Sequence, residues 1–115
     1  MYKNNCLLLL RQEDKILKVT LGGEIDHHNA VSVRSEIDEQ ILSRRPEKTV
    51  LDLSGIDFMD SSGIGLIMGR YTKMKAIGGE LSILDPNDRI LKIFKMAGLE
   101  KIVSIEYTED KKEDK

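Results

Sequence analysis

The stretch 49–84 reads TVLDLSGIDFMDSSGIGLIMGRYTKMKAIGGELSIL, and its hydrophobic pattern changes twice. The apolar run 49–53 predicts a strand inside a sheet, and a loop expected over 54–60 leads to a helix that begins at about Ser61. A pair of glycines should end this helix before a further strand over 80–84. Two strands joined by a helix predict a parallel β-α-β unit with a right-handed crossover. The stripe that should face the core comprises Ile64, Ile67, Met68, Tyr71, Met74 and Ile77.

The segment before this unit predicts a hairpin of two strands and one helix. Strands are expected over 6–12 and 16–22, the second from its alternation of apolar and polar residues. A helix should follow, with Asp26 or Asn29 as its cap and Pro46 beyond its end. Its apolar residues recur at helical spacing: Ala30, Val33, Ile37 and Ile41.

The segment after the unit predicts a third helix and a short strand. Asp85 and Pro86 have the residue types preferred at a helix start, and Gly98 should end the helix. The inward-facing residues of this helix should be Ile90, Leu91, Phe94 and Ala97. The residues that can add a last edge strand are Ile102, Val103 and Ile105.

The element order β-β-α-β-α-β-α-β predicts one α/β domain over residues 1–107. We expect a mixed, mostly parallel sheet of four to five strands with the helices packed on it. The remaining residues, 108–115, are nearly all charged and predict a flexible, solvated tail.

The composition argues against several classes of function. The 115 residues include 18 basic and 20 acidic ones without a basic cluster, which argues against direct binding of nucleic acid. No apolar run approaches the ~18 residues of a membrane span, and the first residues lack a secretory signal, so we expect a cytoplasmic protein. Cys6 is the single cysteine and lies in an apolar run, where it should be buried rather than reactive.

The candidate functional stretch lies at the start of the second helix and reads Asp60-Ser61-Ser62-Gly63-Ile64-Gly65. A glycine inside a helix costs about 1 kcal/mol relative to alanine, which close approach of another backbone or of a partner can offset. Ser61 should occupy the N-cap or the first turn, where it is either a plain helix cap or a phosphoacceptor. A phosphate would add about −1.5 to −2 charges beside Asp57 and Asp60, and would repel a docked partner without refolding the domain.

A dinucleotide-binding site is one alternative reading of the glycines. Gly63, Gly65 and Gly69 lie between a strand and a helix, and an acidic residue follows the next strand. The loop expected over 54–60 separates these glycines from the strand, and the short chain leaves no room for the second half of such a fold. Both points argue against the nucleotide site.

A metal or hydrolase site is a second alternative, at His27 and His28. Neighbouring histidines point in different directions, and no further histidine or suitable cysteine completes a metal site, although Glu24 and Asp26 could assist one. The chain also lacks the Gly-x-Ser-x-Gly elbow of a serine hydrolase. Loop and capping roles therefore fit these residues better.

Several motifs together resemble the anti-sigma factor antagonists of the STAS domain class, and among them the sporulation type. The upstream motif is Gly23-Glu24-Ile25-Asp26-His27-His28-Asn29-Ala30, and the central motif is Phe58-Met59-Asp60-Ser61-Ser62-Gly63-Ile64-Gly65. The stretches 68–71, 77–80 and 96–99 also fit, so the resemblance spans about residues 6–106.

The resemblance implies a STAS-type domain that works as a regulatory switch. The unphosphorylated protein would bind an anti-sigma factor that is also a serine kinase, and so free a sporulation sigma factor. The kinase, which holds the ATP, would phosphorylate Ser61 and end the binding, and a serine phosphatase would reset the switch. The chain would be no enzyme and would hold neither cofactor nor metal. The partner-binding residues implied are Asp26, His27, Asp60, Ser61, Ser62, Gly63, Ile64 and Gly65.

Three other functions remain open at this point. A related antagonist could serve a general-stress pathway. A scaffold subunit would form high-order oligomers, and a nucleotide-binding enzyme would bind or turn over nucleotide.

Overall fold

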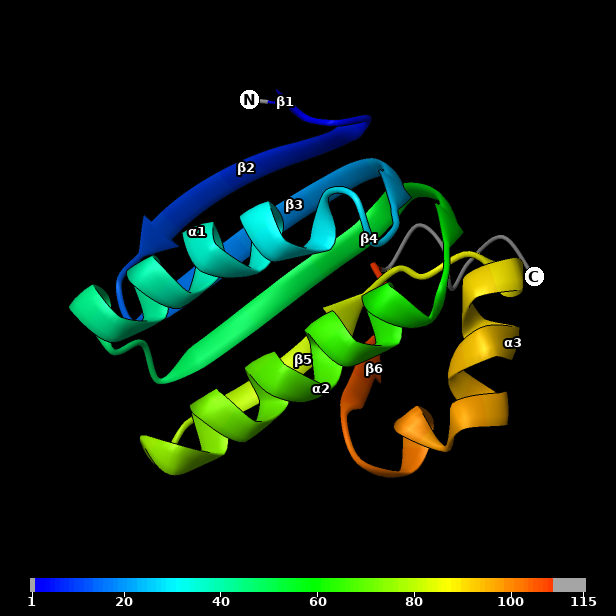
Figure 1. Ribbon diagram of the computed structural model, residues 1–115. Helices are drawn as coiled ribbons and strands as arrows, with labels where there is room; N and C mark the ends of the chain where they lie inside the picture. The colour runs from blue at the N-terminus through cyan, green and yellow to red at the C-terminus, as the bar shows by residue number, and fades with distance from the viewer. Residues whose placement is uncertain (1, 109–115) are drawn as a thin grey trace.

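The computed structural model describes residues 2–108, which form a six-stranded sheet and three α-helices (Figure 1). In chain order the elements are β1 (Tyr2–Lys3), β2 (Cys6–Glu13), β3 (Ile16–Ile25), α1 (Ala30–Arg44), β4 (Lys48–Met59), α2 (Ser61–Ala76), β5 (Glu80–Leu84), α3 (Asp88–Ala97), the 3-10 helix η1 (Leu99–Lys101) and β6 (Ser104–Glu106). The strands lie in the sheet in chain order, antiparallel from β1 to β3 and parallel from β3 to β6.

The predicted single α/β domain with a mixed, mostly parallel sheet is confirmed. The sheet has six strands rather than the four to five expected, because the two-residue strand β1 adds to it. Apart from Thr108, the tail expected over 108–115 lies outside the described residues.

The helices α1 and α2 lie side by side over one face of the sheet, and α3 lies beyond the start of α2 (Figure 1). Cross-strand neighbours under the two helices are fully buried, for example Val19, Leu51 and Ile83. The core therefore sits between this face of the sheet and the two helices. None of the helices in residues 2–108 combines the length and apolar character that a membrane crossing needs.

The first helix and the cysteine agree with the sequence. Val33, Ile37 and Ile41 are buried, and α1 ends where Arg45 takes a left-handed conformation (φ 45°) and donates its backbone N–H to Ile41. Cys6 is fully buried, and this burial raises the pKa of its thiol to about 11.

The loop predicted over 54–60 is wrong, because β4 continues to Met59. The partner strand β3 is likewise longer than 16–22, and the two strands stay paired through two register shifts. Gly55 lies opposite Gly22, where an added Cβ would come within 3.3 Å of the Gly22 Cα, so two glycines allow this close approach. The glycines of α2 thus follow the strand almost directly, and only the chain length still argues against a dinucleotide site.

The inner face of α2 is only partly the one predicted. Ile67 and Met74 are buried as expected, whereas Leu66 and Arg70 are buried and were not in the stripe. The expected residues that are instead half-buried at the core edge are Ile64, Met68, Tyr71 and Ile77.

Arg70 is 3% exposed, and its Nε lies 2.8 Å from Oδ1 of Asp38 on α1. Burial lowers the pKa of this guanidinium, which the Asp38 carboxylate opposes. The ion pair joins α1 to α2.

The predicted start of α3 at Asp85 and Pro86 is also wrong. The helix begins at Asp88, and the cap is Asn87, whose Oδ1 accepts the N–H of Ile90 at 2.9 Å. Asp85 has φ 53° and accepts the N–H of Thr108, so its carboxylate stabilises the chain after β6 instead.

The rest of the C-terminal segment fits in outline. Ile90 and Phe94 are buried as predicted, but Ala97 is exposed. Gly98 ends the helix with φ 76°, as expected, and the edge strand covers 104–106 rather than 102–105.

Candidate functional site

The two sequence motifs meet at one edge of the sheet. Strands β3 and β4 run parallel with Ile25 opposite Met59, and the N–H of Asp60 donates to the carbonyl of Ile25 at 3.1 Å. The loop that follows β3, residues 26–29, therefore lies beside the start of α2. This is the edge where parallel α/β sheets generally present their binding residues.

Asp60, and not Ser61, caps α2. Its backbone is extended, and its Oδ1 accepts the N–H of Ser62 at 2.7 Å. The Asp60 carbonyl also accepts the N–H of Gly63 at 2.9 Å. The plain capping role considered for Ser61 is thus already filled by its neighbour.

Ser61 is the first residue of α2 and is exposed. Within residues 2–108, no hydrogen bond involves its hydroxyl group. A partner can therefore reach the hydroxyl without breaking an internal contact. Ser62 is half-buried, so the two adjacent serines differ in accessibility.

Asp26 and Asn29 build the loop that lies beside Ser61. Oδ1 of Asp26 accepts the N–H groups of His28 and Asn29 at 2.8 and 3.2 Å, which closes a tight turn before α1. The Asn29 side chain is fully buried, and its Nδ2 donates to the carbonyls of Asn4 and Glu24 at 2.8 and 3.0 Å. Asn29 thus anchors the loop, although the sequence suggested only a helix cap.

The two histidines of the loop face different carboxylates. Nδ1 of His27 lies 4.0 Å from Oδ2 of Asp60, whereas Nδ1 of His28 lies 3.7 Å from Oδ1 of Asp26. Both side chains are about 70% exposed (73% and 69%). Among residues 2–108, no three His, Cys, Asp or Glu side chains gather as metal ligands would.

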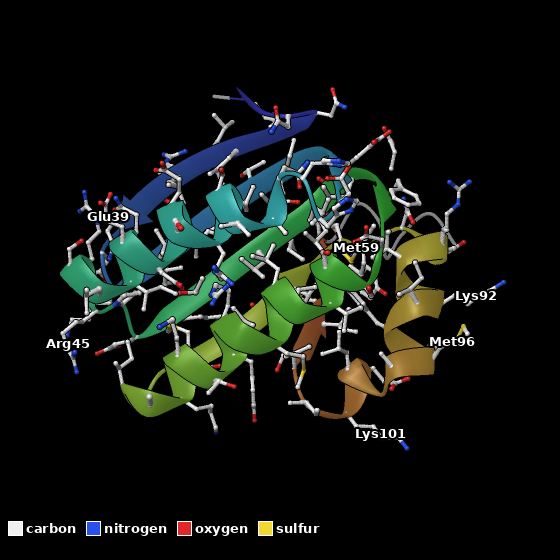
Figure 2. All side chains as sticks on the ribbon, in the orientation of Figure 1. Glu39, Arg45, Met59, Lys92, Met96 and Lys101 are labelled. Atoms are coloured by element: carbon white, nitrogen blue, oxygen red, sulfur yellow. The ribbon has the colours of Figure 1, made fainter. Side chains whose placement is uncertain are left out.

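The glycines at the start of α2 fall into two kinds. A Cβ added to Gly63 would lie 2.1 Å from Cγ of Met59, which Figure 2 labels near the start of the helix. A Cβ added to Gly65 or Gly69 would meet no atom within 4 Å. Among these three glycines of α2, packing therefore requires only Gly63 to be a glycine.

A groove of about 330 Å³ runs between the starts of α1 and α2. Its lining joins the two motifs and consists of His27, Ala30, Val31, Arg34, Ser62, Gly65 and Leu66. Ile64 lies outside this lining and is half-buried against the core. Of the partner-binding residues predicted, His27, Ser61 and Gly65 are exposed at this end of the sheet. Asp26, Asp60 and Ser62 are half-buried beside them, whereas Gly63 is buried.

Comparison with known proteins assigns a family. The STAS domain family matches residues 8–112. The anti-sigma F factor antagonist of Paenibacillus polymyxa is 44% identical over 90 residues, 78% of this chain and 77% of that protein. That of Lysinibacillus sphaericus is 36% identical over 81 residues, 70% of this chain and 69% of that protein. The anti-sigma-B factor antagonist of Bacillus subtilis is 27% identical over 96 residues, 84% of this chain and 86% of that protein.

Solved structures agree with this assignment. The anti-sigma factor antagonist SpoIIAA in its unphosphorylated form superposes with a TM-score of 0.79 at 28% identity, covering 94% of each chain. The phosphorylated form of the Bacillus cell fate determinant SpoIIAA gives a TM-score of 0.72 at 28% identity, covering 94% of this chain and 97% of that chain. By its sequence and its fold this chain belongs to the STAS domain family, in which the relatives named above are anti-sigma factor antagonists.

Proposed function

We propose that this chain is an anti-sigma factor antagonist whose binding is switched off by phosphorylation of Ser61. In the unphosphorylated form, the surface around the start of α2 binds an anti-sigma factor that is a serine kinase, which releases a sigma factor. The kinase supplies the ATP and transfers its γ-phosphate to Ser61, and a serine phosphatase removes the phosphate. In this scheme the chain is ligand and substrate, acts in the cytoplasm, and needs neither cofactor nor metal.

The main support for the proposal is that Asp60 and Ser61 have different roles at the start of α2. Asp60 caps the helix, which leaves the Ser61 hydroxyl exposed and without an internal partner in residues 2–108. A phosphate on Ser61 therefore breaks no contact of the fold. It also lies at a helix N-terminus, where the dipole favours negative charge.

The effect of the phosphate falls on the partner. The end of β4 and the start of α2 already present Asp57 and Asp60, and Asp26 lies in the adjacent loop. Two further negative charges beside them oppose any partner that docks an acidic or apolar surface there. The switch thus works by repulsion on a surface that keeps its shape.

Gly65 and Gly69 support a docking role for the same helix. Neither glycine is required by internal packing, and each lowers helix stability by about 1 kcal/mol relative to alanine. A partner whose backbone approaches α2 closely would account for both. We include Asp26, His27, Ser62 and the segment 60–65 in this binding surface.

The pathway we propose is sporulation. Relatives named for the F factor match at 44% and 36% identity, against 27% and 30% for relatives named for the B factor. The anti-sigma factor antagonist SpoIIAA shares the fold over 94% of this chain. An antagonist in a general-stress pathway is the second candidate.

The test is incubation with the cognate anti-sigma factor kinase and ATP, followed by intact mass measurement and peptide mapping. We expect one phosphate, on Ser61. Ser62→Ala is the matched control and should still be phosphorylated. Ser61→Ala should bind the kinase constitutively, and Ser61→Asp should bind at least about tenfold more weakly, a loss of about 1.4 kcal/mol.

Other outcomes would contradict the proposal in distinct ways. Phosphate on Ser62, or none, would remove the residue assignment and favour constitutive binding or a scaffold role. Ser61→Asp binding as tightly as the parent would reject the repulsion mechanism. Binding of free nucleotide by the isolated chain would favour the nucleotide-enzyme alternative.

A further inference from the structure

A second groove lies away from Ser61, between α1 and the C-terminal end of α2. Its volume is about 570 Å³, which lies in the range of small-molecule sites. Figure 2 labels Glu39 and Arg45 at this end of the helical layer, opposite to Met59 and the start of α2. The proposal above gives this groove no function.

The walls of the groove are aliphatic. They are formed by Ile41 and Leu42 of α1, and by Ala76 and Ile77 at the end of α2. Ile41 is buried and Ile77 is half-buried against the core, whereas Leu42 is 76% exposed. None of the lining residues is aromatic, so the groove offers no stacking surface for a nucleotide base. An alkyl chain fits these walls better.

The rim of the groove carries free cations. Arg34, Arg45 and Lys73 line it, and within residues 2–108 none of them has a carboxylate oxygen within 4.0 Å. Several other basic side chains are ion-paired: Arg11, Lys15, Lys18, Lys48 and Arg70. Three cations without an ion pair in residues 2–108 therefore line one apolar groove.

The carboxylates at the rim only partly offset these cations. Asp38 lines the groove, but its Oδ1 already lies 2.8 Å from Nε of the buried Arg70. This leaves Glu39 as the remaining carboxylate of the lining. The charge balance therefore favours an anion.

We propose that this groove binds a small amphipathic anion, an alkyl chain that carries a carboxylate. The chain lies between α1 and α2 against Leu42 and Ile77, and the carboxylate meets Lys73 and Arg45 at the rim. Arg34 lines both this groove and the one beside Ser62, but Lys73 and Arg45, which meet the carboxylate, line only this groove. Ser61 lies twelve residues before Lys73 on α2, about 18 Å at 1.5 Å per residue, which exceeds the screening length of about 8 Å at physiological salt.

The test is titration of the ¹⁵N-labelled protein with decanoate, below its micelle concentration, followed by amide chemical shifts. We expect saturable shifts at Ile41, Leu42, Lys73 and Ile77. Decyltrimethylammonium has the same alkyl chain with the opposite charge, and acetate has the carboxylate without the chain. Decyltrimethylammonium should bind at least about fivefold more weakly, the factor expected from one charge contact in water. Acetate should bind more weakly still, because it lacks the alkyl chain that the aliphatic walls bury.

Three variants separate the groove from general charge effects. Lys73→Glu should weaken decanoate binding by about fivefold or more, and Leu42→Asn should weaken it without altering the exposed charge. Lys95→Glu is the matched control, because Lys95 also lies in the last turn of its helix but outside the groove. Ser61→Asp should leave the affinity unchanged.

Several results would overturn the inference. Shifts scattered over the surface, or equal binding of the cationic surfactant, would show nonspecific hydrophobic contact. Equal loss in Lys73→Glu and Lys95→Glu would show a net-charge effect. Absence of saturable binding of decanoate would reject the site for this ligand class. None of these results bears on Ser61, so the proposed function would stand.

Discussion

Gly63 and Gly65 lie two residues apart on α2, but their surroundings are opposite. An added Cβ on Gly63 would clash with the buried Met59, whereas one on Gly65 would meet nothing within 4 Å. Gly63 is buried and Gly65 is exposed, so two different reasons explain why a residue that destabilises a helix occurs at each position. The inner glycine is needed for packing. The outer one destabilises the helix without an internal compensation, which the partner docking proposed above would explain.

The largest expected effect is on the inner face, in Gly63→Ala. The methyl group must displace Met59, which is 3% exposed and has little room, so we expect a loss of about 2 kcal/mol in the free energy of unfolding. Urea denaturation measures this loss. In a Met59→Ala background the clashing atoms are gone, and the same change should cost less than about 0.5 kcal/mol. An equal cost in both backgrounds would break the packing explanation.

The second largest effect is expected from removing the N-cap of α2, Asp60. Asp60→Ala removes the acceptor of the Ser62 N–H and should destabilise the domain by about 1 kcal/mol. Ser61→Ala is the control and should change stability by less than about 0.5 kcal/mol, because its hydroxyl makes no hydrogen bond within residues 2–108. A larger loss in Ser61→Ala than in Asp60→Ala would return the capping role to Ser61.

On the outer face, Gly65→Ala should change the free energy of unfolding in the opposite direction. Its backbone is not in a left-handed conformation and the Cβ position is open, so alanine should raise the free energy of unfolding by up to about 1 kcal/mol. Kinase binding should fall about tenfold or more, because Gly65 lines the groove beside His27. Thermal unfolding and calorimetric binding test the two halves separately. Unchanged binding would remove the docking explanation for this glycine.

The smallest effect on binding is expected for Gly69→Ala, one helical turn further on. Stability should rise as for Gly65→Ala, but Gly69 lies outside the groove lining, so binding should change less than about threefold. The difference between the two variants maps how far the partner extends along α2. A larger binding loss at Gly69 than at Gly65 would move the centre of the interface away from Ser61.

The sequence predicted elements well where local pattern and tertiary structure agree. The stripe of α1 is an example, with Val33, Ile37 and Ile41 buried as expected. The sequence-based prediction failed where strand pairing overrides the preference of residues for turns. Ser54 and Gly55 are turn-forming residues, yet pairing with β3 keeps them in β4, and two facing glycines make this possible. No single-sequence pattern shows which glycines will face each other.

In the candidate site, too, the local sequence predicted some features, whereas others depend on tertiary contacts. The position of Ser61 in the first helical turn follows from the local sequence, but its neighbour's role as the cap depends on the extended backbone of Asp60. Asn29 offered only the signal of a helix cap, while its buried side chain binds carbonyls of Asn4 and Glu24. The burial of Arg70 could not be predicted either, since it depends on Asp38 across the helix pair.

Because the Asn29 side chain donates a hydrogen bond to the Asn4 carbonyl, the first residues of the chain affect where the protein can be labelled. Asn4 and Asn5 form a turn with both φ angles positive, 46° and 74°, and their carbonyls accept from Asn29 and from the backbone of Glu24. We expect an affinity tag or fluorescent reporter joined just before this turn to disturb the loop beside Ser61, because Asn4 and Asn5 hold that loop through these hydrogen bonds. Binding measured with such a fusion would report on the attachment as well as on the switch, so a label on the exposed side of α3, for example at Lys92, is the better handle.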